Sequence, residues 1–589
     1  MTSDPTPTPA PSRAGTPSTQ DLAPLRPVAP APHSLSEVAA AFGLVSVPER
    51  SAGAGSAAVP GSTAVPGSPA GAGRPAVPGS PAVPGGSTGA GSADTDVQVR
   101  GVTADNRQVR GGELFAAHTG GHVHGARFAR AAVDAGAAAV LTDPAGADLL
   151  AADEPLGVPV LLADDVPALL GSLAAHLYGT PGETLGTFAL TGTNGKTTTA
   201  FMLDHTLRAL GRRTGLIGTV EVRVGERAVP ATLTTPQPAE LQALLAAMVE
   251  DDVDDLVMEV SSHALALHRV DPLVYDVAGF TNLTPEHLDF HGTVEEYFAA
   301  KASLFAPARS RRGVVLVDDP WGRRLLSECR SAHPGQVLGL AVRADADADV
   351  ADADPEWRVV EARPEGTGTA FTLARRDGSA VRTRTALPGH FNLANAALAV
   401  AMVLASGVDA ATLETALDAA GGVSPQVPGR MEQLAEHPRV IVDFAHNTDA
   451  LAQAIAAVRP GTVGRLVVLF GAAGERDRVK RPEMGRVAVE GADVVVVTDD
   501  DPHDEPAGQI RAEVLAGTTG AVPDTTVREI ADRAEAIRTV VLEADENDTV
   551  LVAGRGHETV QEVAGVAHHL DDREEVRAAL AARAGGQRR

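Results

Sequence analysis

Short apolar runs alternate with longer stretches of helical pattern along most of the chain. Helical patterns occur at residues 33–47, 127–135 and 198–210. Apolar runs of strand length occur at 138–141, 158–161, 187–190, 256–260, 277–280, 314–317, 440–444, 466–470, 494–498 and 550–553. Strands that alternate with helices at this spacing predict largely parallel sheets covered by helices.

The pattern predicts three α/β domains in series. We expect the central domain to contain a parallel sheet like that of P-loop ATPases and the last to be doubly wound, like a Rossmann fold. The predicted parts are a tail at 1–32, a first domain at 33–183, a central domain at 184–428 and a third domain at 429–589. The tail and an insertion at 50–95, which repeats variants of Ala-Val-Pro-Gly-Ser, have too little to bury and are expected to be disordered.

Composition narrows the classes of function. The 589 residues carry a formal charge of -27, which argues against nucleic-acid binding because that needs clustered Lys and Arg. Cys329 is the only cysteine, so an intrachain disulfide is impossible and a cysteine-ligated zinc site is not expected. We find no apolar run near the ~20 residues of a membrane span and no signal region. A cytoplasmic monomer is therefore expected.

Lysine is rare in this chain. Only Lys196, Lys301 and Lys480 occur among the 49 basic residues, and the others are arginines. Where arginine serves as the general positive charge, a retained lysine suggests a position that needs an amine.

Lys196 lies in a glycine-rich turn between the run at 187–190 and the helix at 198–210. The turn reads Thr191-Gly192-Thr193-Asn194-Gly195-Lys196-Thr197-Thr198. Glycines let backbone N–H groups approach phosphate oxygens, and the helix N-terminus favours negative charge. Lys196 can reach the β- and γ-phosphates and Thr197 can ligate Mg²⁺, although Leu190 stands at the first glycine of the strict P-loop pattern. We predict that residues 192–198 bind the phosphates of ATP.

This turn resembles the ATP loop of the Mur ligases and of the related folylpolyglutamate synthetases. Other segments between about 97 and 575 resemble Mur motifs in order and spacing: Glu259 to His263, Asn282 to Asp289, Glu296 to Lys301, His390 to Asn395, Gly429 to Glu432 and Asp443 to His446. Glu286 replaces the usual Asp, and Asn447 and Thr448 replace the usual Thr and Pro. The resemblance implies an ATP-dependent amide ligase that makes an acyl phosphate, which an amine then attacks.

The resemblance also implies roles for single residues. Lys196, Glu259, His287 and Lys301 would be catalytic. Thr197 and Glu259 would hold one Mg²⁺, and His287 with a CO₂-derived carbamate on Lys301 would help to hold a second, since Mg²⁺ prefers oxygen ligands. ATP would also be contacted by Asn392, Asn395, Arg430, Asp443 and His446. Taken alone, Lys301 could be a solvated helix lysine and His287 a capping histidine.

Further segments resemble the Mur ligases that add the third peptide residue, the UDP-N-acetylmuramoyl-tripeptide synthetases. The substrate UDP-N-acetylmuramoyl-L-alanyl-D-glutamate would be bound by Ala104, Asn106, Gly121, His122, Val123, Thr234, Thr235, Ser261, Leu267 and Arg269. Asn106 stands where Ser is commoner, and Leu267 where a polar residue often occurs. The incoming amino acid would contact Arg476, Asp500, Asp501, Pro502, His503, Gly554 and Glu558, with Arg476 on its α-carboxylate and Glu558 on its amine.

The segment Asp499-Asp500-Asp501-Pro502-His503 departs from the Asp-Asn-Pro-Arg of diaminopimelate-adding members. Histidine lacks the guanidinium fork that pairs with a distal carboxylate, and the nearby acidic residues favour a side chain that ends in an amine. We therefore predict addition of L-lysine or L-ornithine. The alternative is meso-diaminopimelate, with another arginine making the pairing.

Three other functions stay open as alternatives. One is a folylpolyglutamate synthetase-like ligase, which would not need a uridine-binding first domain. Another is the amidotransferase-associated Mur homologue, which usually carries a cysteine-rich zinc insertion that a chain with one cysteine does not provide. The last is a non-catalytic Mur homologue, against which the joint presence of the four catalytic candidates argues.

Overall fold

The computed structural model describes residues 25–47, 96–121, 123–343, 348–475, 477–519 and 525–586. The insertion at 50–95 lies outside these residues, as does most of the tail at 1–32. Two compact units are distinguished, residues 31–166 in one and residues 1–30 with 167–589 in the other. The boundaries expected at 183 and 428 stay predictions.

The unit of residues 31–166 contains a five-stranded sheet in the order β2-β7-β6-β5-β4. β4 (Val102–Thr103), β5 (Leu114–Ala117), β6 (Ala139–Thr142) and β7 (Val160–Leu162) are parallel, and β2 (Val45–Ser46) pairs antiparallel with β7. The helices are α1 (Leu35–Phe42), α2 (Ala129–Asp134) and α3 (Pro144–Ala151). The strands predicted at 138–141 and 158–161 are therefore present, shifted by one or two residues.

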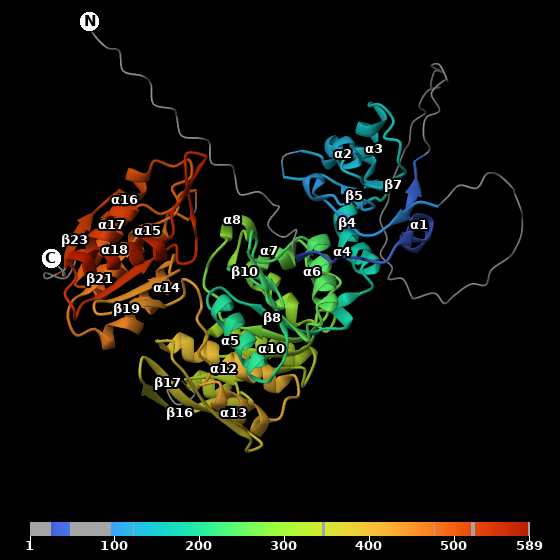
Figure 1. The fold of residues 1–589 in the computed structure, drawn as a ribbon. Helices are drawn as coiled ribbons and strands as arrows, with labels where there is room; N and C mark the ends of the chain where they lie inside the picture. The colour runs from blue at the N-terminus through green and yellow to red at the C-terminus, as the bar shows by residue number, and fades with distance from the viewer. Residues whose placement is uncertain are drawn as a thin grey trace, which may run out of the picture. The chain divides into compact units, whose positions relative to one another are not determined.

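The central sheet has eleven strands in the order β11-β10-β9-β12-β8-β13-β14-β15-β16-β17-β18. Figure 1 labels β8, β10, β16 and β17 of this sheet. Its parallel middle comprises β9 (Thr214–Ile217), β12 (Asp255–Glu259), β8 (Gly186–Thr191), β13 (Tyr275–Phe280), β14 (Ser310–Leu316), β15 (Val337–Ala341) and β16 (Trp357–Glu365). Antiparallel strands extend both edges: β10 (Glu221–Val224), β11 (Arg227–Pro230), β17 (Gly368–Arg375) and β18 (Ala380–Thr385). The sequence predicted β8, β12, β13 and β14 but missed β9, β15 and β16 of the parallel part and all of the antiparallel edge strands.

Both faces of the central sheet are covered, which is why its inner strands are continuously apolar. On β12, Leu256 and Met258 pack into one core and Val257 into the other. The helices of this region are α5 (Lys196–Ala209), α6 (Pro238–Glu250), α7 (Ser262–Ala266), α8 (Leu288–His291), α9 (Val294–Ala302), α10 (Pro320–Ala332), α12 (His390–Ala405) and α13 (Ala410–Ala419). The carboxyl ends of β8, β12 and β13 lie together, and the sequence motifs follow them.

The last sheet has the order β19-β20-β24-β21-β22-β23. β20 (Arg439–Asp443), β24 (Thr549–Ala553), β21 (Leu466–Phe470), β22 (Val494–Val497) and β23 (Thr526–Glu529) are parallel, and β19 (Glu432–Glu436) is an antiparallel edge. Its helices are α14 (Thr448–Val458), α15 (Lys480–Gly491), α16 (Ala507–Ala516), α17 (Arg533–Glu543) and α18 (Asp572–Gly586). A hairpin of β25 (Val560–Val563) and β26 (Val566–His569) follows β24. The predicted doubly wound α/β arrangement is confirmed.

Across the described ranges, no helix combines the length and the apolar character that crossing a membrane requires.

Candidate active site

The glycine-rich turn after β8 is tied to the segment that follows β13. Thr193 Oγ1 donates to the Thr284 carbonyl oxygen (3.1 Å), and the Asn194 N–H donates to Asn282 Oδ1 (3.0 Å). Gly192 has φ +143°, and a Cβ there would lie 1.9 Å from Thr281 Oγ1. Glycine is therefore required where the turn meets the strand end, because both the backbone angle and the space exclude a side chain.

Two lysines meet at this turn. Lys196 Nζ donates to the carbonyl oxygens of Gly192 (3.0 Å) and Thr193 (2.9 Å), and Lys301 Nζ donates to that of Gly192 (2.7 Å). Lys301 is 2% exposed and lies over the Tyr297 ring, 4.5 Å from its centroid. Burial, and then the neighbouring charge of Lys196, hold the pKa of Lys301 well below its usual range. Lys301 is thus not a solvated helix lysine.

Glu259, at the end of β12, is completely buried beside the start of α5. Its Oε2 accepts from Thr197 Oγ1 (3.0 Å) and from Thr219 Oγ1 (3.1 Å), and its Oε1 accepts from the Thr219 N–H (2.8 Å). A Cβ at Gly218 would lie 2.4 Å from Glu259 Oε1, so glycine leaves room for the carboxylate. A hydroxyl and a carboxylate in direct contact are oxygen donors of the kind that suit Mg²⁺.

His287 precedes α8 with φ +57° and lies among aromatic rings, 4.9 Å from His263 and 6.3 Å from Tyr297 between centroids. Burial lowers the pKa of His287 to about 4, against the charge of Glu286. The imidazole is therefore neutral at neutral pH, which is the form that can ligate a metal. It has no side-chain capping hydrogen bond to the helix, so the capping interpretation does not describe it.

Glu286, beside His287, contacts the loop between β20 and α14. Its Oε1 lies 3.2 Å from His446 Nε2, and His446 Nδ1 lies 2.8 Å from the Phe444 carbonyl oxygen. Burial raises the pKa of Glu286, but the hydrogen bond and charge of His446, with the charges of His287 and Lys196, outweigh it and hold that pKa below its usual range. The predicted catalytic and nucleotide residues thus meet here.

The other predicted nucleotide residues lie around the same turn. Asn392 and Asn395 are buried on α12, and Asn395 Oδ1 would lie 2.5 Å from a Cβ at Gly195. An Arg430 guanidinium nitrogen lies 3.4 Å from Thr197 Oγ1, and the guanidinium stacks on the Phe444 ring at 4.0 Å. Asp443 accepts from the Met431 N–H (2.7 Å), so it holds the segment that carries Arg430.

The predicted substrate-binding residues of the central region lie close to Glu259. Thr235 is buried and its hydroxyl donates to the Glu259 carbonyl oxygen (3.0 Å), so it fixes the loop to the end of β12. Ser261 Oγ accepts from the Ala264 N–H as the N-cap of α7. Arg269 donates to the Thr235 carbonyl oxygen (3.4 Å), whereas Leu267 is 50% exposed. The substrate contacts of this group stay predictions.

In the unit of residues 31–166, the residues predicted to bind the UDP-linked substrate lie in two loops. Ala104 follows β4, and Asn106 begins a short 3-10 helix, Asn106–Gln108. Gly121 and Val123 belong to the second loop, where the Gly120 N–H donates to the Val123 carbonyl oxygen (3.0 Å). His122 lies outside the described residues.

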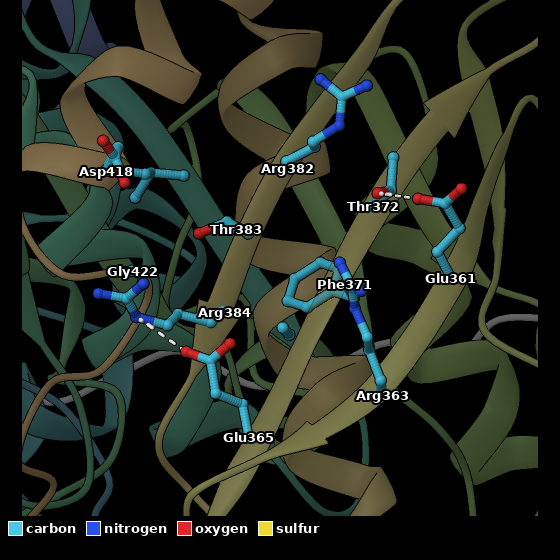
Figure 2. Close-up of a pocket in the computed structure, with 12 residues that line it drawn as sticks. Glu361, Arg363, Glu365, Phe371, Thr372, Arg382, Thr383, Arg384, Asp418 and Gly422 are labelled. Atoms are coloured by element: carbon cyan, nitrogen blue, oxygen red, sulfur yellow. Dashed lines mark hydrogen bonds and ion pairs between the residues drawn. The ribbon is translucent and has the colours of Figure 1, made fainter.

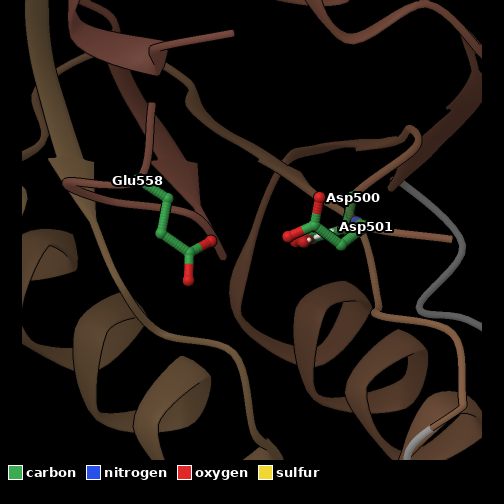
Figure 3. Close-up of side chains that lie close together, drawn as sticks. All are labelled: Asp500, Asp501 and Glu558. Atoms are coloured by element: carbon green, nitrogen blue, oxygen red, sulfur yellow. Dashed lines mark hydrogen bonds between the residues drawn. The ribbon is translucent and has the colours of Figure 1, made fainter. Parts of the chain in front are cut away.

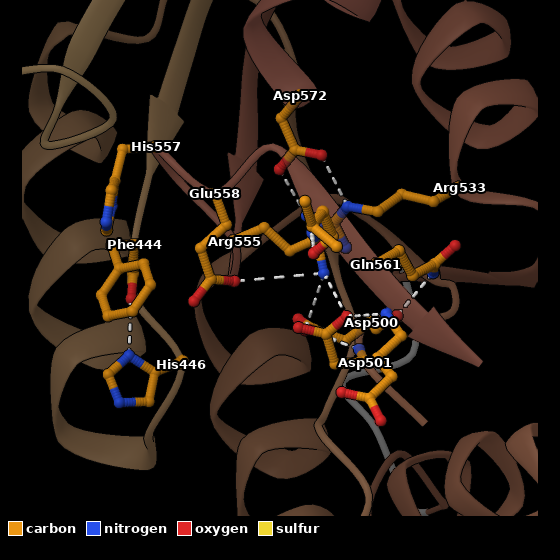
Figure 4. Close-up of polar contacts among 12 residues, drawn as sticks. Phe444, His446, Asp500, Asp501, Arg533, Arg555, His557, Glu558, Gln561 and Asp572 are labelled. Atoms are coloured by element: carbon orange, nitrogen blue, oxygen red, sulfur yellow. Dashed lines mark hydrogen bonds and ion pairs between the residues drawn. The ribbon is translucent and has the colours of Figure 1, made fainter. Parts of the chain in front are cut away.

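Three carboxylates gather at the predicted amino-acid site. Asp500, Asp501 and Glu558 each place an oxygen within 4.8 Å of the others (Figure 3). Burial and then the charge of Asp500 raise the pKa of Glu558 to about 8. Arg555, completely buried, lies 2.8 Å from Asp501 Oδ1 and 4.0 Å from Glu558 Oε2 (Figure 4). Gly554, with φ +118°, leads into this site, and a Cβ there would lie 2.6 Å from Asp500 Oδ2. Arg476 lies outside the described residues.

Most carboxylates of the acidic loop at residues 499–505 are paired with arginines. The lysine or ornithine prediction assumed that they were unpaired, and that premise is wrong. Asp501 pairs with Arg555, Asp499 with Arg511, and Glu505 with Arg481 (2.7 Å) and Arg478. His503 turns to the hairpin, where its Nδ1 lies 3.4 Å from Glu562 Oε2. His503 therefore holds the loop against β25, whereas Pro502 accepts from the Glu505 N–H (3.0 Å) within the loop. Arginines remote in sequence supply the positive charge.

Three residues at the site were not among the candidates. Tyr297 bonds to Thr193 Oγ1 (3.0 Å) and packs under Lys301, and its place in the segment that leads to Lys301 is a signal that was available. Arg555 lies between the two glycines of the segment 554–558, which also carries Glu558, and this position is a signal that was available. Thr219 carries no sequence signal, because only the fold brings the turn after β9 to Glu259.

A separate hollow of about 170 Å³ lies over strands β16 to β18 and contains none of these residues (Figure 2). Arg363, Arg382 and Arg384 line it together with Glu361, Glu365 and Asp418, so its charges are balanced, and Arg384 pairs with Glu365 at 3.5 Å.

Known proteins are similar to this chain along most of its length. Three family models match: "Mur ligase family, catalytic domain" over residues 98–178, "Mur ligase middle domain" over 190–403, and "Mur ligase, glutamate ligase domain" over 429–556. A UDP-N-acetylmuramoyl-L-alanyl-D-glutamate–2,6-diaminopimelate ligase of Streptomyces coelicolor is 43% identical over 491 residues, which cover 83% of this chain and 93% of that protein. A UDP-N-acetylmuramyl-tripeptide synthetase of Leifsonia xyli is 43% identical over 486 residues, covering 82% and 92%.

A solved structure of a UDP-N-acetylmuramoyl-L-alanyl-D-glutamate–2,6-diaminopimelate ligase is also similar. It is 29% identical, covers 82% of this chain and 95% of its own, and superposes with a TM-score of 0.55.

Proposed function

The chain belongs to the Mur ligase family, as a ligase of peptidoglycan precursor synthesis, and we propose that it joins meso-diaminopimelate to UDP-N-acetylmuramoyl-L-alanyl-D-glutamate at the expense of ATP. The relatives named for diaminopimelate favour this substrate over the lysine or ornithine predicted from the sequence, a prediction they do not support. Because ATP and the UDP-linked precursor are nucleotides, we place the reaction in the cytoplasm.

One observation carries the proposal. Lys196, Glu259, His287 and Lys301, which come from four separate motifs, gather around a single turn. Lys196 and Lys301 share the Gly192 carbonyl oxygen as an acceptor. Glu259 accepts from Thr197, the residue that follows Lys196. Dispersed residues would have contradicted an active site, whereas this grouping supplies both cations and oxygen ligands where ATP phosphates would lie.

The proposed reaction has two steps. A carboxylate oxygen of the precursor forms a bond to the γ-phosphorus of ATP, and the bond from that phosphorus to the β,γ-bridging oxygen breaks to release ADP. The amine nitrogen of the incoming amino acid then bonds to the acyl carbon, phosphate leaves, and the nitrogen loses a proton. Both partners of the first step are anionic, so a site must neutralise charge at the transferring phosphoryl group. Lys196 and Arg430 provide fixed positive charge there.

The oxygen and nitrogen donors fit the metal that this chemistry needs. Thr197 and Glu259 would hold one Mg²⁺, and His287 with carbamylated Lys301 would hold another. Mg²⁺ supplies charge neutralisation at the phosphoryl oxygens. Lys301 suits carbamylation because burial lowers its pKa and so favours the neutral amine, which is the form that can add CO₂.

Glu558 has the properties of an acceptor for the incoming amine. Its pKa of about 8 is near that of a proton acceptor that works at neutral to mildly alkaline pH. Arg476 would bind the α-carboxylate of the incoming amino acid. Arg478 and Arg511 already pair with Glu505 and Asp499, so the acidic loop is neutralised and does not by itself exclude a substrate with a second carboxylate.

The test is phosphate release from ATP by the full chain with UDP-N-acetylmuramoyl-L-alanyl-D-glutamate and either meso-diaminopimelate, L-lysine or L-ornithine. We expect kcat/KM for diaminopimelate to exceed the others by about tenfold or more, as a lost buried ionic pairing would cost. Mass spectrometry of the product confirms which amide forms. A preference for lysine or ornithine would overturn the choice of amino acid, and no turnover with any of them would overturn the function.

A further inference from the structure

Two threonine hydroxyls form a chain that ends on the buried carboxylate of Glu259. Thr219 lies in the turn between β9 and β10, and Thr234 in the loop between β11 and α6. Thr219 donates its hydroxyl to Glu259 Oε2 (3.1 Å) and its N–H to Oε1 (2.8 Å). Thr219 Oγ1 is also 3.1 Å from Thr234 Oγ1. Both threonines are half-buried, so the end of the chain at Thr234 remains open to a ligand.

The direction of these hydrogen bonds is set by the carboxylate. An ionised carboxylate only accepts, and a hydroxyl has a single proton. Thr219 therefore uses its proton on Glu259 and faces Thr234 with lone pairs alone. The Thr234 hydroxyl must then donate to Thr219, so that only its lone pairs are left for a ligand.

We propose that Thr219 is a positioning residue that fixes the Thr234 hydroxyl as a hydrogen-bond acceptor, and that Thr234 recognises an amide N–H of the acyl-donor substrate. This inference rests on the proposed function, which supplies a peptide with such a group. An oxygen without a free proton pairs with an N–H donor and repels a carboxylate. Arg269, bonded to the next residue of the same loop, supplies the opposite charge for a carboxylate.

The position of Thr234 indicates which N–H is recognised. Only Thr219 stands between Thr234 and Glu259, and Glu259 is bonded to the nucleotide turn through Thr197. The N–H is therefore the one nearest the reacting carboxylate, that of the D-glutamate residue.

The test uses a substrate analogue in which an ester oxygen replaces the D-glutamate N–H. Calorimetry on the full chain measures the dissociation constants of the amide and the ester. We expect the wild type to bind the ester about tenfold more weakly, since a buried acceptor loses its donor. Thr234→Val should bind both with nearly equal affinity. Thr219→Val should lose most of the discrimination, because the Thr234 hydroxyl can then rotate to donate, and Thr219→Ser should restore it.

A matched control is available in the last domain. Thr462 Oγ1 donates to Thr549 Oγ1 at 3.0 Å, a hydroxyl pair like that of Thr219 and Thr234 but remote from the turn. Thr462→Val should leave the ratio of the ester to the amide dissociation constant at about ten. Equal binding of amide and ester by the wild type would overturn the inference and leave the proposed function intact. Discrimination that survives Thr234→Val would overturn it as well, even if Thr219→Val failed to fold. A wild type that binds neither would contradict the proposed function itself.

Discussion

Lys196 and Lys301 donate to the same acceptor, the carbonyl oxygen of Gly192, at 3.0 and 2.7 Å. Burial penalises the charge of both amines, and the charge of Lys196 adds to the penalty on Lys301. The pKa of each is lowered, that of Lys301 well below its usual range. Lys301 is thus the amine that can stay neutral, while Lys196 has Glu259 and Glu286 to favour its charge.

The first prediction is that activity depends on CO₂. A neutral Lys301 amine adds CO₂ reversibly, so enzyme kept in CO₂-depleted buffer should lose most of its turnover and recover it when bicarbonate is added. Carbon-13 NMR with labelled bicarbonate should show one carbamate signal, absent from Lys301→Ala. Turnover that is independent of bicarbonate, or Lys301→Ala with wild-type activity, would rule out the carbamate.

The second prediction concerns stability. Because the folded-state pKa of Lys301 is below that of the unfolded chain, the unfolded state binds more protons between those two values, and folding stability falls as pH falls through that window. In CO₂-free buffer, Lys301→Met should therefore melt about 2–4 °C above the wild type at pH 7. The gain should shrink as pH approaches the unfolded value of about 10.4. Calorimetric scans at several pH values measure it, and a variant that melts lower throughout would contradict the lowered pKa.

The third prediction tests whether Glu286 acts through its negative charge or through the length of its side chain. The side chain bridges to His446, a predicted nucleotide contact, at 3.2 Å. Glu286→Asp keeps the charge but is one methylene too short for His446, whereas Glu286→Gln keeps the reach without the charge. If the bridge positions His446, the KM for ATP should rise about fivefold in the Asp variant and less in the Gln variant, with kcat nearly unchanged.

The control for this pair is Glu574→Asp, which shortens an exposed glutamate that contacts His569 at 2.8 Å. It should leave the KM for ATP unchanged, as solvated pairs contribute little. If Glu286→Gln were the more damaged variant, Glu286 would act through its charge on Lys196 and His287 and not through His446.

The fourth prediction is a pH dependence of amino-acid binding. Burial and Asp500 raise the pKa of Glu558 to about 8, so the carboxyl is protonated below that value and ionised above it. Since the ionised form attracts the substrate amine, the KM for the amino acid should fall as pH rises through about 8. Glu558→Gln should have a higher KM with little change over the same range. Steady-state kinetics from pH 6.5 to 9.5 decide it, and a wild-type KM that is flat across this range would refute the assignment.

The sequence alone determined the layered α/β architecture, and its resemblance to the Mur ligases supplied the four catalytic candidates. Inner strands such as β12 are apolar at consecutive positions, because both faces of the sheet are covered, and that pattern is local. The motifs follow strand ends, and parallel strands present their carboxyl ends at one edge, which is the physical reason that the fold brings the motifs together.

Only the tertiary structure decided the strands β16 to β18 at one side of the central sheet and the partners of the charges. β16 to β18 mix buried and exposed positions and carry charged residues, so no apolar run marks them. The acidic loop showed its carboxylates but not Arg511 and Arg555, which come to it from 12 and 54 residues beyond Asp499 and Asp501. Thr219 likewise reaches Glu259 across 40 residues. Periodicity records which face of an element is buried, whereas a hydrogen bond between distant segments depends on how the elements pack.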